Sequence, residues 1–560
     1  MQSAETVGEE WLRLLKSRGV DFLFANSGTD FPSIIEGLAR SHHFGIPVPR
    51  PVIAPHENAA VSMAHGYALV TGRAQAAMVH VNVGTANALN GLLNAERDYV
   101  PLLLAAGRTP IRESAAPGAR SLGIHWAQEM FDQAAMVRET VRWDYELRHP
   151  SQLEVMTDRA LALAHSVPRG PVYLTLPREV LAASPAGQTG LRSRMMPASR
   201  IAPDPTAVTA AAAALAAAQR PVIVTARAGA DRNVPERLAR LAEQLAAPVI
   251  EYRPRHMNLS TDHPLHGGFE VRPWLAEADA ILVLECDVPW IPDSDRVSPD
   301  ALVIQAGEDP LHARYVIRGF AADITIRGST ALVVDALLAE IDGAASARAM
   351  SRRDAAEAAC RARRAPAPDL RFPPSRMSME WASFCLDQAR AADSILVNEY
   401  PLVRSAMRVS VPGTYFGSSP AGGLGWGLPA GLGVKLAAPE REVIVAVGDG
   451  SYIFANPIAC HQIALSERIP LLTVVFNNRS WGAVSRATKA LYPDGYAARA
   501  NSMPLTSLDP VLPFAEIAAA CGLFGRTVSD PAALPGVLEE ALAEVRGAHR
   551  GAVVDVLCDG

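Results

Sequence analysis

The most constraining feature of this sequence is a Gly-Asp-Gly turn that is followed, after 26 intervening residues, by an Asn-Asn pair. The apolar run 443–447 leads into Gly448-Asp449-Gly450, and the apolar run 471–476 leads into Asn477-Asn478. Continuous apolar runs of this kind are typical of strands that are buried on both faces of a parallel sheet. Because parallel strands open their carboxyl ends on one edge, we expect the acid and the amides to lie together there. One carboxylate and one amide oxygen are too few to enclose Ca²⁺, but they suit Mg²⁺, which completes its shell with phosphate and water oxygens.

Length and composition indicate a globular protein with several domains. A chain of 560 residues is too long for one core and predicts two to four domains. The net charge is −6 and Lys and Arg form no long run, which argues against nucleic acid as a partner. The first 19 residues contain three Glu and no apolar segment, and nowhere do 18 apolar residues follow one another, so we expect neither a secretion signal nor a membrane span. The six cysteines form no CxxC pair and are expected to be free thiols in a cytoplasmic protein.

Short apolar runs alternate with helical patterns in three parts of the chain. This alternation predicts an α/β protein with three doubly wound, parallel-sheet domains. We place an N-terminal domain at 1–188, a central domain at 190–345 and a C-terminal domain at 376–560. The segment 346–375 is rich in Ala, Arg and Pro and is expected to be a partly helical linker.

The three α/β domains, the GDG…NN motif and a glutamate after an early apolar run together resemble one enzyme group. They look like the pyruvate decarboxylase and acetolactate synthase group of thiamin diphosphate (ThDP) enzymes. This resemblance implies that the N-terminal domain binds the aminopyrimidine of ThDP, and that the C-terminal domain of a partner subunit binds its diphosphate. A homodimer is therefore expected at minimum, and a homotetramer is the common assembly. A Gly-Asp-Gly sequence without the distant Asn-Asn pair would more often be a simple turn.

Glu57 is the residue through which the resemblance reaches the first domain. It follows the apolar run PVIAP, in PHENAAV, where this family has the glutamate that hydrogen-bonds N1′ of the aminopyrimidine. A carboxyl group there interconverts the amino and imino forms of the ring, and the imino nitrogen can remove the proton from C2 of the cofactor. Read alone, an acid at this place would be a favourable partner of a helix N-terminus.

The resemblance also assigns cofactor contacts to the last domain. Leu424, in the glycine-rich segment 417–433, is implied to hold the two cofactor rings in a bent shape, and the carbonyl of Gly422 is implied to accept from the 4′-amino group. A glycine-rich turn before a helix would explain the glycines but not the leucine among them. The implied diphosphate contacts are the backbone groups of Gly448, Gly450 and Ser451.

For the metal, the resemblance implies three oxygen ligands around Mg²⁺. These are the carboxylate of Asp449, the side-chain oxygen of Asn478 and the carbonyl of Ser480. The segment NEYPLVRS departs from relatives that have hydroxyl groups after Asn-Glu, because 400–402 are Tyr, Pro and Leu. Diphosphate contacts from that segment are therefore not expected. FAD, which acetolactate synthases contain, has no motif in this sequence and is not favoured.

His80 bears on the type of reaction. It stands four residues before a glycine in VHVNVG, as does a histidine of benzoylformate decarboxylase that is an acid–base group for the substrate. Thr29 falls where that enzyme has a substrate-binding serine, and the counterpart of its second active-site histidine is missing, with Trp290 nearby in CDVPWIP. His125, in HWAQEM, lies in a segment that resembles an acetolactate synthase loop. The alternative for a single histidine at a strand end is a hydrogen-bonded core residue.

A separate prediction concerns Asp30. It directly precedes the helical pattern FPSIIEGL, and we expect its side chain to cap the start of that helix.

The sequence therefore predicts a Mg²⁺/ThDP enzyme that cleaves the C–C bond next to the keto group of a 2-oxo acid through an enamine. The leading interpretation is a decarboxylase or aldehyde-type carboligase resembling benzoylformate decarboxylase, because of His80. Acetolactate synthase activity is the alternative, and a non-catalytic ThDP-binding protein is a third. The side chain of the substrate and the fate of the enamine, protonation or capture by a second carbonyl, stay open at this point.

Overall fold

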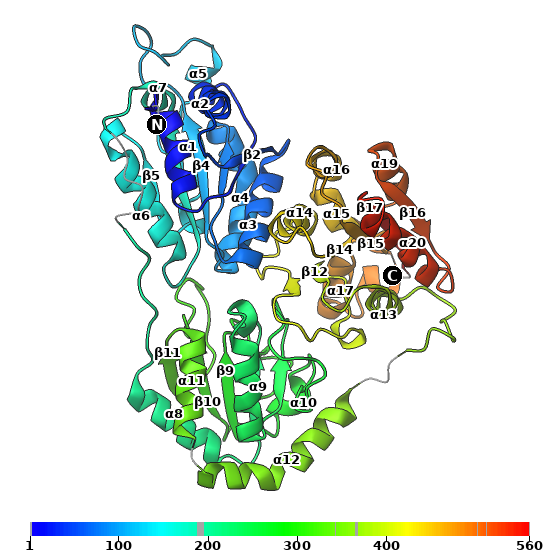
Figure 1. Ribbon diagram of the computed structural model, residues 1–560. Coiled ribbons are helices and arrows are strands. Elements are labelled where there is room, and N and C mark those ends of the chain that lie inside the picture. Colours follow the sequence, from blue (N-terminus) through cyan, green and yellow to red (C-terminus); the bar gives the residue numbers. More distant parts are fainter. Residues whose placement is uncertain are drawn as a thin grey trace. The chain divides into compact units, whose positions relative to one another are not determined.

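The structure is a computed structural model that describes residues 3–187, 195–341, 343–364, 368–500, 502–510 and 512–558. It contains three parallel sheets of six, five and six strands with helices packed on them (Figure 1). The predicted α/β class with three doubly wound sheets is confirmed. Two compact units divide the chain: the first comprises Met1–Ala198, Val397–Pro401 and Ser418–Gly560, and the second comprises Ser199–Leu396 and Leu402–Gly417. Among the described residues, no helix is both long and apolar enough to cross a bilayer.

The first sheet has the strand order β2-β1-β3-β4-β6-β5. Its strands are β1 (Phe22–Ala25), β2 (Arg50–Ile53), β3 (Ala76–Val79), β4 (Leu102–Arg108), β5 (Asp144–Glu146) and β6 (Pro171–Pro177). The helices are α1 (Val7–Ser17), α2 (Pro32–His43), α3 (Glu57–Thr71), α4 (Val81–Arg97), α5 (Ile124–Ala127), α6 (Leu153–His165) and α7 (Arg178–Ala182). Strand β1 pairs with β3 as well as with β2, so the carboxyl ends of β1 and β3 are neighbours although β2 lies between them in sequence. This adjacency positions the site described below.

The second sheet has the strand order β11-β10-β9-β7-β8. Its strands are β7 (Pro221–Thr225), β8 (Val249–Glu251), β9 (Ala280–Leu284), β10 (Leu302–Gly307) and β11 (Ile324–Arg327). The helices are α8 (Pro205–Ala217), α9 (Val234–Leu245), α10 (Arg272–Leu275), α11 (Thr330–Glu340) and α12 (Gly343–Arg363). Apolar side chains from both faces of this sheet form two buried clusters. Helix α12 covers residues 346–363 of the segment 346–375 that the sequence presents as a linker.

The third sheet has the strand order β13-β12-β14-β15-β17-β16. Its strands are β12 (Ile395–Glu399), β13 (Tyr415–Gly417), β14 (Val443–Gly448), β15 (Leu472–Asn477), β16 (Phe524–Val528) and β17 (Ala552–Leu557). The helices are α13 (Met379–Ala389), α14 (Gly427–Ala437), α15 (Asp449–Phe454), α16 (Pro457–Ser466), α17 (Gly482–Leu491), α18 (Tyr496–Arg499), α19 (Phe514–Ala520) and α20 (Leu534–Arg546). Strands β14 and β15 pair in parallel up to Gly448 and Phe476, so the GDG turn and the Asn-Asn pair leave the same edge of the sheet.

Helices α3 and α14 pack with their backbones in direct contact. A Cβ atom at Gly66 of α3 would lie 2.0 Å from the carbonyl oxygen of Ala430, and a Cβ atom at Gly433 of α14 would lie 2.0 Å from that of Met63. The contact is reciprocal, and a glycine faces a backbone carbonyl on each side. Helix α3 is buried from Glu57 to Ala68, which is consistent with its small, apolar sequence.

We expect Gly433→Ala to lower the free energy of unfolding by about 1–3 kcal/mol, because backbone atoms cannot move aside as a side chain can. The matched control is Gly536→Ala in α20, where a Cβ atom would meet nothing within 4 Å. Alanine is the better helix former, so the control should be neutral or more stable by up to about 1 kcal/mol. Urea unfolding followed by circular dichroism measures both variants. Equal stability of Gly433→Ala and wild type would contradict the packing described here.

Candidate functional site

Glu57 is a buried carboxylate that two amide side chains hold in place. It is the first residue of α3, and its Oε1 and Oε2 accept hydrogen bonds from Nδ2 of Asn26 (3.0 Å) and Nδ2 of Asn87 (3.1 Å). Asn26 follows β1 and Asn87 lies in α4, so three elements of the first sheet meet at this carboxylate. Each oxygen accepts one bond from these amides, which leaves lone pairs for a further donor. The geometry of the Glu57 carboxylate therefore fits a ligand whose ring nitrogen or amino group can donate a hydrogen bond.

His80 and Asp30 form a hydrogen-bonded pair at the adjacent ends of β3 and β1. Nδ1 of His80 lies 2.5 Å from Oδ1 of Asp30, whose Oδ2 accepts from the backbone N–H of Val81 at 3.3 Å. The hydrogen bond from Asp30 raises the pKa of His80, although burial opposes it, and the negative charge of Glu57 adds to the rise. The imidazole is therefore held towards its protonated form.

Two glycines make room for this pair. A Cβ atom at position 28 would lie 2.2 Å from Nδ1 of His80, and one at position 107 would lie 1.7 Å from Oδ2 of Asp30. The prediction that Asp30 caps α2 is wrong, because the N-cap residue of α2 is Phe31 and makes no side-chain cap bond. The physical reason is that the carboxylate of Asp30 turns instead to the start of α4, where an imidazole and a backbone N–H are both available.

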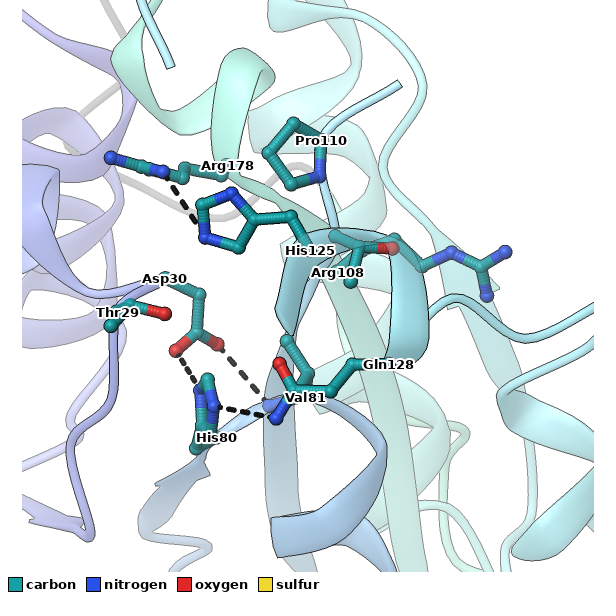
Figure 2. A pocket seen from close by; sticks show the side chains of 10 residues that line it. Thr29, Asp30, His80, Val81, Arg108, Pro110, His125, Gln128 and Arg178 are labelled. Carbon is teal, nitrogen blue, oxygen red and sulfur yellow. Dashed lines mark hydrogen bonds and ion pairs between the residues drawn. The ribbon is translucent and has the colours of Figure 1, made fainter. Parts of the chain in front are cut away.

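A pocket opens over this pair (Figure 2). Its polar lining consists of Thr29, Asp30, His80, Arg108, Thr109, His125, Gln128 and Arg178. The side-chain amide of Gln128 lies 3.2 Å from Nε2 of His80. The structure thus brings together Thr29, His80 and His125, which the sequence analysis selected on separate grounds.

Trp290 is not among the residues that line this pocket. Its ring is 5% exposed, belongs to a buried apolar cluster of the second sheet and packs edge-on against Phe320 at 5.4 Å. The surroundings of Trp290 are those of a core residue.

The glycine-rich segment before α14 is held by amide side chains of the first domain. Nδ2 of Asn90 donates to the carbonyl of Leu424 at 3.0 Å, Nδ2 of Asn94 donates to the carbonyl of Gly423 at 2.8 Å, and Nδ2 of Asn58 donates to the carbonyl of Gly425 at 3.2 Å. Gly422 has a φ of +70°, a conformation that favours glycine. Asparagines of α3 and α4, the first of them next to Glu57 in sequence, therefore fix the backbone on which Gly422 and Leu424 are carried.

Glu399 supports the same segment from the other side. It ends β12, is 1% exposed, and accepts from the backbone N–H groups of Gly425 (2.7 Å) and Gly427 (2.5 Å). Burial raises the pKa of Glu399 to about 7, although the hydrogen bonds from these glycines and from Ser451 oppose the rise. One carboxyl group thus connects the glycine-rich segment to the first turn of α15.

The residues proposed for a metal also lie together. Oδ2 of Asp449 accepts from the backbone N–H of Ser480 at 3.3 Å, and Oδ1 of Asn478 accepts from the same group at 3.1 Å. Burial raises the pKa of Asp449, and among the described residues no cationic side chain pairs with it. The charge of Asp449 in turn contributes to a raised pKa of Asp555, about 6, which is caused first by burial. Buried negative charge without a counter-charge fits a cation.

The ligand set available to such a cation is limited. Among the described residues, no group of three or more His, Cys, Asp or Glu side chains could hold a metal ion. A cation beside Asp449 would therefore take amide, backbone and external oxygens, which is the preference of Mg²⁺ bound together with phosphate.

Sequence reasoning missed several residues that shape this site. They are Asn26, Asp30 as the partner of His80, Asn87, Gln128, Arg178 and Glu399. Asp30 directly follows Thr29 and Gln128 lies three residues after His125, so proximity to selected residues was an available signal for these two. Nothing in the sequence indicates that Glu399 would bond a segment 26 to 28 residues further on.

Comparisons with known proteins relate the whole chain to one group of sequences and structures. Three family models match: the N-terminal TPP-binding domain of thiamine pyrophosphate enzymes over residues 5–136, their central domain over 208–337 and their C-terminal TPP-binding domain over 400–556. A protein of Pseudomonas aeruginosa named probable 2-ketoarginine decarboxylase is 31% identical over 502 residues, which are 86% of this chain and 84% of that protein. The acetolactate synthase large subunit of Mycobacterium tuberculosis is 28% identical over 98% of this chain and 94% of its own length. The solved structure of the Rhodococcus jostii ThDP-dependent 4-hydroxybenzoylformate decarboxylase superposes with a TM-score of 0.78 at 25% identity and covers 99% of each chain.

The Asp30–His80 pair generates a prediction that needs no ligand. Asp30→Asn should lower the pKa of His80, because the amide keeps the shape but removes the charge that favours the imidazolium. NMR titration of ¹³C-labelled histidine measures the pKa of His80, and His80→Ala assigns its signal.

The same pair affects the pH dependence of stability. A raised pKa in the folded state stabilises the protein below the ordinary histidine pKa, and that stabilisation is lost as pH rises through the raised value. The stability difference between wild type and Asp30→Asn should therefore shrink as pH rises from 5 to 8. An unchanged titration of His80 would contradict the pairing.

Proposed function

Because the chain belongs to the thiamin diphosphate-dependent enzymes of the decarboxylase and acetolactate synthase group, we propose that it is a Mg²⁺/ThDP-dependent 2-oxo acid decarboxylase similar to benzoylformate decarboxylase. The observation that carries this proposal is the Asp30–His80 pair in the pocket, with Nδ1 and Oδ1 2.5 Å apart. ThDP, when bound, supplies the nucleophilic carbon and the electron sink for loss of CO₂. The residues of the chain supply binding, orientation and the proton.

The pyrimidine end of ThDP is assigned to Glu57. Its carboxylate is held by hydrogen bonds from Asn26 and Asn87, so little conformational freedom of this side chain is lost on binding. The carbonyl of Gly422 and the side chain of Leu424 are the proposed partners on the other domain. The diphosphate is assigned to the start of α15, at Gly448, Gly450 and Ser451.

Mg²⁺ is assigned to Asp449, Asn478 and Ser480. A divalent cation there would relieve the burial cost of the Asp449 carboxylate, which otherwise shows as its raised pKa. We further propose that the functional unit is at least a homodimer, in which the N-terminal domain of one subunit and the C-terminal domain of another share one ThDP, as the family resemblance implies.

His80 is the proposed general acid. Asp30 accepts from the Nδ1–H of His80, so the proton that the imidazolium can give up is the one on Nε2, which lies 3.2 Å from the side-chain amide of Gln128. The carbon that has lost CO₂ needs one proton before an aldehyde can leave, and an imidazolium can donate it. Activity that depends on the imidazolium is present at low pH and is lost as the pH rises through the raised pKa of His80.

A second candidate function is a carboligase of the acetolactate synthase type. The observation that favours it is the segment with His125 and Gln128, which resembles the loop of those enzymes and lies in the same pocket as His80. A carboligase joins the carbon to a second carbonyl and depends less on a proton donor. The products therefore distinguish the two functions.

Asp449→Ala should abolish the Mg²⁺-dependent stabilisation of the protein by ThDP and leave the fold intact. A ligand that binds the folded state raises the melting temperature by mass action, so thermal unfolding with and without ThDP and Mg²⁺ measures the loss. Asp300→Ala, at an exposed aspartate, is the matched control and should keep the full rise. The same rise in Asp449→Ala as in wild type would remove Asp449 from the metal site.

His80→Ala should lower the rate of aldehyde release roughly 100-fold or more, because a positioned general acid contributes about 10²- to 10⁴-fold. Binding of ThDP should persist, and added aldehyde should divert the product towards acyloin. Product analysis by chromatography over a panel of 2-oxo acids measures this, with the exposed His42 changed to alanine as the control. Conversion of pyruvate to acetolactate as the main wild-type reaction, unchanged in His80→Ala, would favour the carboligase instead.

A further inference from the structure

Arg178 is a cation of the pocket, and no carboxylate of the described residues neutralises it. It is the first residue of α7, directly after β6, and its side chain lines the pocket beside His125 (Figure 2). Its side-chain contacts are both at 3.5 Å, from Nη1 to Oγ of Ser121 and to Nε2 of His125. Within the described ranges, no acidic side chain forms an ion pair with it.

The neighbouring arginines differ from Arg178 in this respect. Arg108 and Arg120 both bind the carboxylate of Glu129, at 2.7 and 2.6 Å. Glu179 follows Arg178 in sequence, but its carboxylate accepts from the backbone N–H groups of residues 111 and 112, each at 2.8 Å. Asp30, the acid among the residues that line the pocket, is engaged by His80. Among the described residues, Arg178 is therefore a positive charge of the pocket that has no carboxylate partner.

The hydrogen bonding of His125 adds a second, independent observation. Its Nδ1 accepts from the backbone N–H of Ser121 at 3.1 Å, so the proton of the neutral ring is on Nε2. Burial lowers the pKa of His125, and the charges of Arg178 and Arg120 lower it further, which favours the neutral ring. Arg178 has only donors, and it faces the N–H of this ring across 3.5 Å. Apart from Oγ of Ser121 at 3.5 Å, no side chain of the described residues offers these two donors an acceptor, which points to an acceptor that arrives with a ligand.

We propose that this pocket selects 2-oxo acids that carry a second anionic group at the far end of the molecule, and that Arg178 and His125 bind this group. The proposal rests on the function proposed above and names its substrate class. Carboxylate, sulfonate and phosphonate share the required chemistry, because each presents oxygen acceptors and negative charge to the two donors.

The carboxylate that leaves as CO₂ is a less suitable partner for Arg178. A strong ion pair with that group would stabilise the ground state, and it would be lost as the charge moves away, so it would slow decarboxylation. An ion pair with a distant group that does not react is kept throughout the reaction. Arg178 then contributes binding without opposing the chemical step.

The test compares substrates that differ in the charge of the far end. The holoenzyme, loaded with ThDP and Mg²⁺, is assayed with three anionic substrates (2-oxoglutarate, sulfopyruvate and phosphonopyruvate), with neutral 2-oxohexanoate and with cationic 2-oxo-5-guanidinopentanoate. We expect an anionic substrate to have the highest kcat/KM, and the assay shows which anion it is. Wild-type preference for the neutral or the cationic substrate would overturn the proposal.

Arg178→Gln should lower the ratio of kcat/KM for the best anionic substrate to that for 2-oxohexanoate by roughly 10- to 100-fold, mainly through KM. Arg178→Glu should move the preference towards the guanidino substrate. Arg138→Gln is the matched control, because Arg138 is an exposed arginine that pairs with Asp132 and Asp144, and its ratio should equal that of wild type. An unchanged ratio in Arg178→Gln would overturn the proposal.

A binding measurement separates failure of this inference from failure of the proposed function. Calorimetry with glutarate, a dicarboxylate that cannot react, and with hexanoate uses the same wild-type and Arg178→Gln holoenzymes. In the wild type, glutarate should bind more tightly than hexanoate. In Arg178→Gln, this difference in affinity should disappear. If no 2-oxo acid is turned over but this difference is found, the reaction is wrong and the anion site stands. If 2-oxo acids are turned over but glutarate and hexanoate bind alike in both proteins, the anion site is wrong.

Discussion

The backbone contact between α3 and α14 is the constraint on which the rest of the site depends. A glycine on each helix faces a carbonyl on the other, so the two helices approach more closely than side chains would allow. Helix α3 begins with Glu57, and α14 follows the segment that carries Gly422 and Leu424. The contact therefore sets the distance between the first domain and the glycine-rich segment, and the amide bonds from Asn58, Asn90 and Asn94 then fix the path of that segment.

Much of the fold follows from local pattern. The apolar runs before the GDG turn and the Asn-Asn pair predicted two strands, and β14 and β15 match those runs within one residue at each end. Strands buried on both faces have a strong pattern, because every residue must be apolar. The sharing of one sheet edge by the turn and the amides followed from the rule for parallel strands, and the pairing of β14 with β15 bears it out.

The site was less predictable, for a reason of topology. His80 and Asp30 are 50 residues apart, and they meet because β1 pairs with β3 while β2 occupies the edge. Strand order is a property of the whole sheet and leaves little trace in a local sequence pattern. The N-cap prediction for Asp30 failed for the same reason, since the propensity of aspartate to cap the next helix was outweighed by a distant imidazole. The metal and cofactor residues were selected by resemblance to a family and stay predictions.

The space around the Asp30–His80 pair has a consequence for protein engineering. Gly28 and Gly107 lie so close to the pair that any side chain there would overlap the imidazole or the carboxylate. A working pair therefore requires all four positions at once, the two glycines as well as the acid and the base. Grafting the pair into a related pocket would require both glycines as well, and a single mutation at either glycine would remove a working pair without touching it. An evolutionary path to such a pair would open the space first and acquire the acid and the base afterwards.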